Sequence, residues 1–425
     1  MVEESAGSPK SILVIGGGIS GITAAIEAAE VGYDVFLVEN NPFLGGRVIR
    51  SNQYFPKLCP PTCGLEINFK RLKAHPRVRI LTMAEVENIS GKEGDFDVTV
   101  KLAPRFVNDN CTACNKCAEA CPVERPNDLN FGMDKTKAIY LPHFMAFPMK
   151  YVIDSSVCPG SECAKCVEAC QYDAIDLAMP EQTLNLKVGA IVAATGWKPY
   201  DATRIEPLGF GKYPNVITNV MMERLAVSDG PTGGKVVRPS DGKDIESIAF
   251  VQCAGSRDKN HLPYCSAVCC LGSLKQATYV KERYPDAKVF IFYMDIRAPG
   301  TLEDFYVRVQ RDYGVSLVRG KVARIKEEPE TNDLIVEVED TMAGKKINEK
   351  VNMVVLATGI VPSILDNGIP AEITCDDYGF ITSAQPGIYA AGCARMPADV
   401  STSVQNATSA TLKAIQSVVG GGANG

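Results

Sequence analysis

The sequence predicts an α/β protein with two sheet-and-helix units and a cysteine-rich insertion, and three observations support this. A short apolar run, SILVI at 11–15, leads into a glycine-rich turn and an alanine-rich helical run. A second apolar run, IESIAFV at 245–251, precedes an apparent helix near 266–284. Between them lie two four-cysteine runs, at 111–122 and 158–170. Strands that alternate with helices indicate parallel sheets, and closely spaced cysteines indicate a separate module.

Composition narrows the class of protein. A chain of 425 residues with 46% hydrophobic and 22% charged residues is long enough for two or three packed domains. The net charge of −6 gives no reason to expect a nucleic-acid partner. No apolar stretch approaches the roughly 20 residues that cross a bilayer, and the start lacks the apolar segment of a secretion signal. We therefore expect a cytoplasmic protein that associates with a membrane only through partner subunits.

Cysteine usage points to metal or redox chemistry. The chain has 16 cysteines, most of them in tight clusters, and only three histidines, which lie far apart. Clustered cysteines in a cytosolic protein indicate metal or redox sites rather than a disulfide framework. The scattered histidines argue against a mixed Cys/His zinc site and against a catalytic triad.

The first apolar run opens a dinucleotide-binding pattern. GGGISG at 16–21 matches GxGxxG between a strand and a helix, and the next strand ends in Glu39. Gly16 makes the tight turn, Gly18 lets the backbone approach a pyrophosphate, and Gly21 lets the helix pack on the strand. The helix N-terminus would bind the phosphates, and Glu39 would accept hydrogen bonds from the ribose.

Several later motifs indicate that this nucleotide is FAD. The continuation Gly45-Gly46-Arg47 resembles flavoproteins of the two-dinucleotide-binding-domain class, which includes thioredoxin reductase. AIVAATG at 190–196, VVLATG at 354–359 and the segment 387–411 resemble the crossovers and the last FAD motif of that class. Cys393 stands where the class usually has an aspartate. The resemblance adds these candidate FAD-binding residues: Gly45, Gly46, Arg47, Thr195, Gly196, Thr358, Gly359, Gly392 and Cys393.

The two four-cysteine runs match a two-cluster ferredoxin. CTACNKCAEACP is C-x2-C-x2-C-x3-C-P, and CPGSECAKCVEAC repeats the pattern with two extra residues in the first gap. In such ferredoxins the fourth cysteine of each run ligates the cluster of the other run. Zinc knuckles are the alternative, since thiolates also bind zinc, but the repeated spacing favours two [4Fe–4S] clusters. The expected ligand sets are Cys111, Cys114, Cys117 and Cys170 for one cluster, and Cys158, Cys163, Cys166 and Cys121 for the other.

The second sheet-and-helix unit carries cysteines where flavin reductases bind NAD(P)H. Its strand-to-helix connection, VQCAGSRDKNHLPYCSAVCC at 251–270, has one glycine, Gly255, and four cysteines. Bulky thiol-bearing residues keep backbone amides away from a pyrophosphate, so we expect no NAD(P)H site here.

This connection resembles the A-type subunits of the heterodisulfide reductase family, through its CAGSRD opening, its YCSAVCC centre and the Lys-Gln-Ala that follows. The resemblance spans almost the whole chain. It implies a third [4Fe–4S] cluster on Cys253, Cys265, Cys269 and Cys270, with Lys275 near the flavin ring as the candidate catalytic residue. Buried structural thiols, with Lys275 on a solvated helix face, are the alternative.

The chain is shorter than many family members and most resembles the A-type component of the quinone-interacting membrane-bound oxidoreductase (Qmo) complex of sulfate reducers. That resemblance implies electron transfer between menaquinone and adenylylsulfate reductase. The implied partners are a related flavin/iron–sulfur subunit and a membrane haem subunit. The alternative is a soluble heterodisulfide-reductase-like or flavin-bifurcating subunit. A scaffold with vestigial cofactors is a third possibility, against which the complete ligand sets argue.

The expected domain organisation places the insertion inside the FAD-binding domain. Three interpretations stay open for the two cysteines of CPPTC at 59–63: a redox pair, cluster ligands or plain loop thiols. The expected segments are 1–105 (FAD-binding domain, first part, starting directly at its strand), 106–180 (ferredoxin insertion), 181–240 (return and linker), 241–330 (second Rossmann-like domain) and 331–425 (FAD-binding domain, last part).

Overall fold

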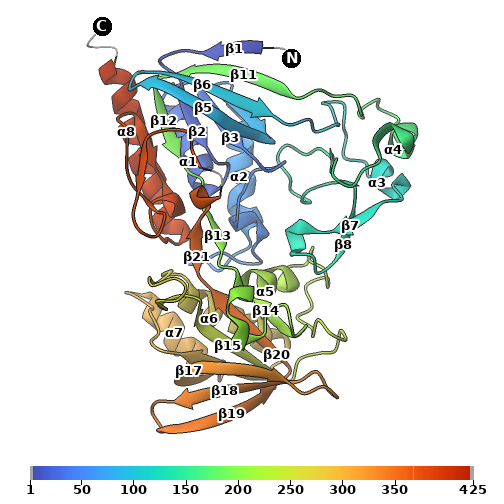
Figure 1. Cartoon of the computed structure of the whole chain (residues 1–425), viewed down its shortest axis with the longest axis vertical. Coiled ribbons are helices and arrows are strands. Elements are labelled where there is room, and N and C mark those ends of the chain that lie inside the picture. The colour runs from blue at the N-terminus through green and yellow to red at the C-terminus, as the bar shows by residue number, and fades with distance from the viewer. Residues whose placement is uncertain (1–2, 367, 422–425) are drawn as a thin grey trace.

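A computed structural model describes residues 3–366 and 368–421, and Figure 1 shows its three parts. The upper part is built on a five-stranded parallel sheet with the order β24-β12-β2-β3-β4. All four residues of β12, an interior strand, are buried, as expected for a strand covered on both faces. Its strands are β2 (Ile12–Ile15), β3 (Val35–Glu39), β4 (Val78–Thr82), β12 (Ala190–Ala193) and β24 (Ile388–Ala390).

Helices cover one face of this sheet and a second sheet covers the other. Side chains of α1 (Ile19–Glu30), α2 (Pro61–Ala74) and α8 (Val400–Gly421) share one hydrophobic core with the first face. On the second face lies a four-stranded sheet in the order β1-β11-β6-β5, which shares another core with it. Those strands are β1 (Glu3–Gly7), β5 (Ala84–Lys92), β6 (Asp95–Leu102) and β11 (Gln182–Val188). β1 pairs in parallel with β11 at one edge of this second sheet, within the expected segment 1–105.

The cysteine-rich insertion leaves the four-stranded sheet at the end of β6 and returns at the start of β11. It forms the separate lobe at the right of Figure 1. This excursion covers residues 103–181, close to the expected 106–180. Its short helices pack against each other around a core that includes Cys117 and Cys166. The elements are α3 (Lys116–Ala120), β7 (Glu124–Pro126), β8 (Lys135–Lys137), β9 (Ile139–Tyr140), β10 (Val152–Ile153) and α4 (Lys165–Ala169).

The lower part is a second unit on a seven-stranded sheet, ordered β14-β20-β15-β16-β17-β18-β19. It extends beyond the expected 241–330 at both ends, because β14 lies before that range and β18, β19 and β20 lie after it. β20 lies between β14 and β15, and all six of its residues are buried. The sequence of such an apolar run is equally compatible with the five-stranded sheet and with this one. The strands are β14 (Val216–Thr218), β15 (Ser247–Ala254), β16 (Lys288–Tyr293), β17 (Ser316–Glu327), β18 (Leu334–Asp340), β19 (Lys345–Val351) and β20 (Met353–Thr358).

Two connecting strands, β13 (Trp197–Pro199) and β21 (Ile360–Pro362), pair antiparallel and join the upper part to the second unit. The upper part contains most of the expected FAD-binding motifs and is here called the flavin-type part. The helices of the second unit are α5 (Asn219–Ala226), α6 (Cys269–Arg283) and α7 (Leu302–Arg311), and a small hairpin follows β21, made of β22 (Ile373–Cys375) and β23 (Ile381–Ala384). Among residues 3–366 and 368–421, no helix combines the length and apolar character needed to cross a bilayer.

Candidate flavin and cluster sites

A cavity of about 660 Å³ lies at the carboxyl ends of the five-stranded sheet. Its volume is within the range of pockets that bind cofactors and drug-sized ligands. Such crevices at the carboxyl ends of parallel strands are where α/β proteins bind nucleotides. The expected FAD-binding residues in its wall are Gly16, Gly18, Glu39, Gly46, Arg47, Thr195, Gly196 and Cys393.

The glycine-rich turn has no room for side chains at two positions. Gly16 has φ +108°, and a β-carbon there would lie 2.3 Å from the Ala194 carbonyl oxygen. A β-carbon on Gly21 would lie 1.8 Å from the Gly16 carbonyl oxygen. Gly21 therefore shapes the turn without lining the cavity, as the sequence predicts. Gly45 and Gly392 have positive φ angles, as Gly16 does, and do not line the cavity.

Glu39 fixes the loop at the end of β3. The carboxylate is 7% exposed and accepts hydrogen bonds from the Gly17 backbone N–H (2.6 Å) and the Asn41 backbone N–H (2.8 Å). These bonds hold the carboxylate at the wall of the cavity, which suits a ribose acceptor.

Arg47 and Thr195 present polar groups at the cavity. The Arg47 Nε–H donates to the Trp197 carbonyl oxygen (3.1 Å), and its guanidinium carbon lies 5.6 Å from the Trp197 ring centre. Burial, with the nearby charge of Arg50, lowers the pKa of Arg47 to about 10. The buried Thr195 hydroxyl has no hydrogen-bond partner among the described residues. A buried hydroxyl of this kind needs a partner, so its position fits a bound polar ligand.

The helix α8 begins at the opposite wall. Asp399 caps it, because its carboxylate accepts a hydrogen bond from the Thr402 N–H (2.7 Å), and Asp399 also lines the cavity. Sequence reasoning missed this residue, although an aspartate directly before a helix is a recognisable N-cap. Cys393 is buried, which raises the pKa of its thiol, and its Sγ lies 3.4 Å from the Ala398 carbonyl oxygen. Ala84, Glu85 and Val86 of β5, also missed, line the cavity as well.

The insertion brings one expected ligand set around a single small cavity, whose wall contains Cys121, Cys158, Cys163 and Cys166. Cys121 comes from the first run and the other three from the second, which is the expected crossed arrangement. Ala164 has φ +46° and lies between the second and third cysteines of its run. Asn115, with φ +72°, holds the corresponding place in the other run.

The other set is less closely defined. Burial raises the pKa of Cys117 to about 12, with smaller contributions from Cys111 and Cys114. Cys111, Cys117 and Cys170 belong to one packed cluster, while Cys114 is exposed. In the described part of the chain, no three His, Cys, Asp or Glu side chains converge as ligands of a single metal ion.

In the second unit, four thiols gather where β15 ends and α6 begins. Cys269 and Cys270 form the first residues of α6, and Cys253 is the next-to-last residue of β15, in a left-handed conformation (φ +57°). Burial is the main cause of the raised pKa of Cys253, about 11, and of the raised pKa of Cys269. Smaller contributions to the pKa of Cys269 come from the other thiols, Cys265 included, so the four lie within electrostatic reach of one another.

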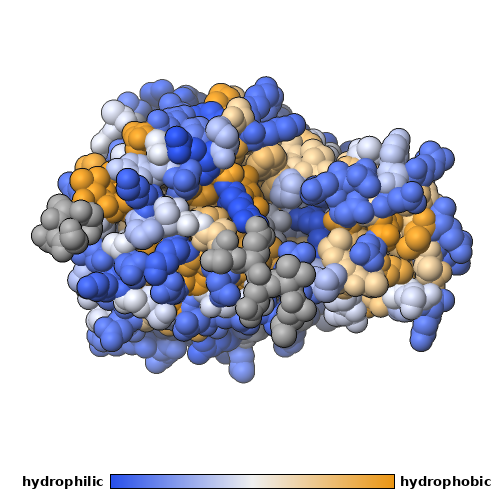
Figure 2. Space-filling model, turned by 90° about the horizontal axis from the view of Figure 1, so that it is seen from above, coloured by the Kyte–Doolittle hydropathy of each residue, from blue (hydrophilic) through white to orange (hydrophobic). Residues whose placement is uncertain are grey.

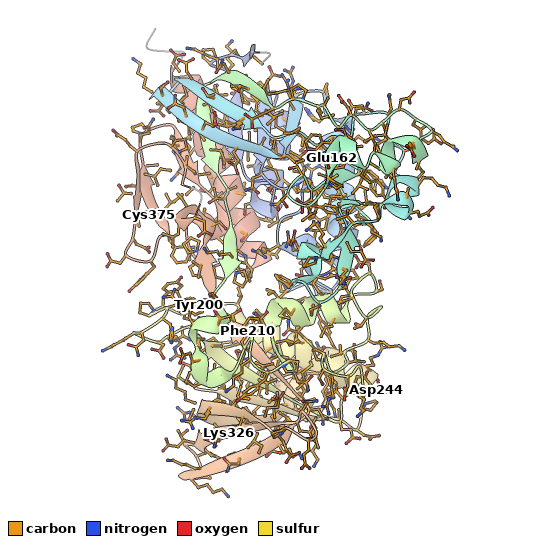
Figure 3. All side chains as sticks on the ribbon, turned by 45° about the vertical axis from the view of Figure 1, so that its right-hand side comes forward. Glu162, Tyr200, Phe210, Asp244, Lys326 and Cys375 are labelled. Atoms are coloured by element: carbon orange, nitrogen blue, oxygen red, sulfur yellow. The ribbon has the colours of Figure 1, made fainter. Side chains whose placement is uncertain are left out.

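Thr358 and Gly359 lie beside this cysteine loop and not in the wall of the large cavity. The Cys269 Sγ–H donates to the Thr358 carbonyl oxygen (3.6 Å). A β-carbon on Gly359 would lie 2.3 Å from Ser256 Oγ and 2.7 Å from Ser266 Oγ. Tyr200, labelled between the two units in Figure 3, contacts this crossover, because its backbone N–H donates to the Gly359 carbonyl oxygen (2.9 Å). The crossover thus links the cysteine loop to the flavin-type part.

Lys275 is buried but does not line the large cavity. Its ammonium group lies 2.9 Å from a carboxylate oxygen of Glu223 and donates to the Gln53 carbonyl oxygen. The position of Lys275 beside a flavin ring stays a prediction. The contacts of Lys275 with Glu223 and Gln53 connect α6 to α5 and to the loop after Arg47.

The CPPTC cysteines lie apart from these sites. Cys63 is exposed on the first turn of α2, and Cys59 is partly buried beside Tyr54. The Cys59 thiol is hydrogen-bonded to the Tyr54 side chain, which is the main reason that the pKa of Tyr54 rises to about 12. Neither cysteine is in a disulfide.

Comparison with known proteins points to one family. Residues 11–59 match the family described as FAD dependent oxidoreductase. The chain is 41% identical over 424 residues to the second iron–sulfur A subunit of the CoB–CoM heterodisulfide reductase of Methanopyrus kandleri, covering 96% of this chain and 64% of that protein. It is 38% identical to the A subunit of the H2:CoB–CoM heterodisulfide, ferredoxin reductase of Methanothermobacter marburgensis, with the same coverage. The chain thus spans less than two thirds of the length of these relatives.

Solved structures agree on the fold. The thioredoxin reductase of T. acidophilum is 14% identical, with a TM-score of 0.52 over 96% of this chain and 98% of that one. The bacillithiol disulfide reductase of Bacillus cereus is 12% identical, with a TM-score of 0.52 over 97% and 99% of the two chains. The expected α/β fold of the thioredoxin reductase type is therefore confirmed.

Proposed function

Because the chain belongs to the heterodisulfide reductase family of A-type subunits over the region that it shares with those proteins, we propose that it transfers electrons between FAD and iron–sulfur clusters within a larger complex. One observation carries the proposal: a four-thiol loop begins α6, at the place where a phosphate-binding turn would stand, and a backbone crossover links it to the flavin-type part. FAD exchanges electrons in pairs and each cluster exchanges one, so the combination would convert between the two.

Each group would be held by residues already described. The large cavity would hold FAD, with its phosphates at the turn of Gly16 and Gly18 and its ribose at Glu39. Two [4Fe–4S] clusters would occupy the insertion and a third the cysteine loop. The chain's own contribution is to orient these groups, exclude water and set their potentials by hydrogen bonds and burial.

The finer form of the proposal is a Qmo-type role, which passes electrons between menaquinone and adenylylsulfate reductase. Its support is the sequence resemblance given above. A related flavin/iron–sulfur subunit and a membrane haem subunit would then anchor this chain at the cytoplasmic face. The second candidate is a soluble heterodisulfide-reductase-like or flavin-bifurcating subunit, and the names of the similar methanogen proteins fit it no better than they fit the Qmo-type role.

Anaerobic titration of the purified protein with NADH, NADPH and then dithionite tests the main proposal. We expect dithionite to bleach the flavin absorbance and both nicotinamides to leave it unchanged at millimolar concentration. Prompt bleaching by either nicotinamide would overturn it.

Reconstitution separates the two candidate roles. The chain with its partner subunits would be supplied with a reduced menaquinone analogue, and turnover of adenylylsulfate reductase would be compared with reduction of a heterodisulfide. Turnover of adenylylsulfate reductase alone favours the Qmo-type role. Heterodisulfide reduction favours the soluble one.

A further inference from the structure

Gln252 is a buried amide without a visible partner. It directly precedes Cys253 in β15 and is 8% exposed. Neither its Oε1 nor its Nε2 has a hydrogen-bond partner among the described residues. A buried primary amide in a native protein normally satisfies its donors and its acceptor, so this one requires an explanation.

Gln276, another buried amide of the same unit, differs from Gln252 in its donors. The Nε2 of Gln276 donates to the Asn219 carbonyl oxygen (2.8 Å) and to Glu223 Oε1 (2.7 Å), whereas its Oε1 has no partner among the described residues. The chain itself therefore satisfies the donors of Gln276. At Gln252 both donors, as well as the acceptor, are left for something else.

The strand pattern places Gln252 on the α6 side of the sheet. Ile248 and Phe250 pack in the same core as Leu271 and Leu274 of α6, whereas Val251 packs in the core of the opposite face. Because side chains alternate along a strand, Gln252 follows Ile248 and Phe250 on the α6 side. The helix on that side starts with Cys269 and Cys270.

A bulge ends this alternation at the cysteine. Val251 pairs with Leu356 and Ala254 pairs with Thr358, so β15 carries one extra residue between these pairs. Bulges of this kind re-aim side chains at the ends of strands. Here the extra residue is accompanied by the left-handed backbone of Cys253. Gln252 and Cys253 thus stand together where the strand meets the first turn of α6.

We infer that the Gln252 side-chain amide donates a hydrogen bond to a sulfur of the cluster held by Cys253, Cys265, Cys269 and Cys270, and thereby raises that cluster's reduction potential. This inference rests on the proposed third cluster. Reduction adds negative charge to the cluster, and a hydrogen-bond donor stabilises that charge. Gln252 is a positioning and tuning residue, since it is not a ligand.

The test is a potentiometric titration of the complete protein, followed by electron paramagnetic resonance. Gln252→Met keeps the length of the side chain and removes the donor. We expect its third-cluster signal to titrate at a lower potential than in the wild type, with unchanged ferredoxin-type signals. Val251→Ala is the matched control, because Val251 is the neighbour on the opposite face, and we expect it to keep the wild-type potential.

Each outcome decides a separate point. A wild-type protein without a third cluster signal would overturn both the cluster and the role of Gln252. A third cluster whose potential is the same in Gln252→Met and in the wild type would overturn the role of Gln252 alone. If Gln252→Met fails to assemble, pulsed resonance on wild-type protein labelled with 15N-glutamine decides: coupling of a side-chain 15N to the third cluster supports the inference, and its absence overturns it.

Discussion

A β-carbon has no place at the turn where β2 meets α1. The carbonyl oxygens of Ala194 and Gly16 occupy the positions that side chains at Gly16 and Gly21 would need. Backbone atoms of a sheet cannot shift aside as a flexible side chain can. The close packing of α1 on β2, and with it the phosphate end of the cavity, depends on these two glycines.

Replacement of Gly21 by alanine is expected to abolish FAD binding. The new β-carbon would push α1 away from the turn and widen the phosphate site, so the FAD content per chain should fall at least tenfold. The measurement is the ratio of flavin absorbance to protein. Gly64→Ala is the control: its β-carbon meets no atom closer than 3.8 Å, and alanine should stabilise α2 by about 1 kcal/mol. Retention of FAD in Gly21→Ala would contradict this account.

Residues differ in how well the sequence predicts their place. Gly16 and Gly21 are predictable because the need for a missing side chain shows directly in the sequence. Thr195 and Thr358 stand in the same Ala-Thr-Gly context, yet Thr195 lines the large cavity and Thr358 contacts Cys269. Lys275 is similar, since its buried pairing with Glu223 joins residues far apart in the chain. Contacts between residues that are far apart in the chain leave no local sequence pattern from which they could be predicted.

Two repeated helices organise the insertion. Each follows a left-handed residue, Asn115 before α3 and Ala164 before α4, and each carries the third cysteine of its run, Cys117 or Cys166. The fourth cysteine of each run directly follows the last residue of its helix. This repeat explains why the cysteine spacing alone predicts the crossed ligand set found around the small cavity.

Substitution of Cys121 by serine is expected to remove one ferredoxin-type cluster and leave the other. Cys121 shares its cavity with Cys158, Cys163 and Cys166, so the lost cluster should be the one of the second run. Iron analysis should show a loss equal to one [4Fe–4S] cluster. Cys114→Ser is the matched variant and should remove the other cluster. Identical resonance spectra in the two variants would contradict crossed ligation.

The pairing of the strands into sheets was harder to predict from the sequence than the helices and the cysteine clusters. The sequence predicts β15 and β16, because strand, helix and strand follow one another there. It does not predict that β14 and β20 join the same sheet, since pairing with a distant strand leaves no local signal. β1 pairs with β11 across almost 180 residues for the same reason.

At the scale of the molecule, a buried carboxylate holds the two units together. Glu223 on α5 accepts hydrogen bonds from the Asn52 backbone N–H (3.0 Å), the Gln276 side chain (2.7 Å) and the Tyr279 hydroxyl (3.2 Å), besides its ion pair with Lys275. Asn52 belongs to the flavin-type part and the other residues to the second unit. The two units therefore meet through a fully paired buried charge.

Lys275→Met is expected to destabilise the protein by about 3 kcal/mol, because it leaves a buried carboxylate without its counter-charge. Urea unfolding measures this loss, and the exposed Lys288→Met serves as control and should change little. If Lys275→Met instead preserved stability and altered the flavin spectrum, the predicted position of Lys275 at the flavin ring would be favoured over its pairing role.

A buried histidine makes the stability of the whole molecule depend on pH. His143 in the insertion is 3% exposed, and its Nε2 lies 3.6 Å from a carboxylate oxygen of Asp229 in the second unit. Burial lowers its pKa from the ordinary 6.5 to about 4, against the raising effect of Asp229, and Arg224 and Arg50 lower it further. The unfolded chain therefore takes up a proton at a higher pH than the folded protein does.

Because of this difference in pKa, the free energy of unfolding is expected to decrease as the pH falls. As the pH falls from about 6.5 to about 4, His143 should cost up to about 1.4 kcal/mol of unfolding free energy per pH unit, and the loss should level off below pH 4. Urea unfolding of the wild type and of His143→Gln measures the difference in slope. Parallel curves for wild type and His143→Gln would contradict the proposed pKa.

The lobe at the right of Figure 2 shows hydrophobic patches on its surface. The exposed apolar side chains of the insertion include Phe144, Val157 and Tyr172. Yet the two ends of this lobe meet at a single point of the main body. Leu102 and Gln182 are directly paired partners of β6 and β11. If the segment between them were cut out, a tight turn could close the two strands into an ordinary β-hairpin. The chain thus enters and leaves the cysteine-rich insertion at one paired position of the main body, while Phe147 and Asn130 of the insertion make further contacts with the rest of the protein.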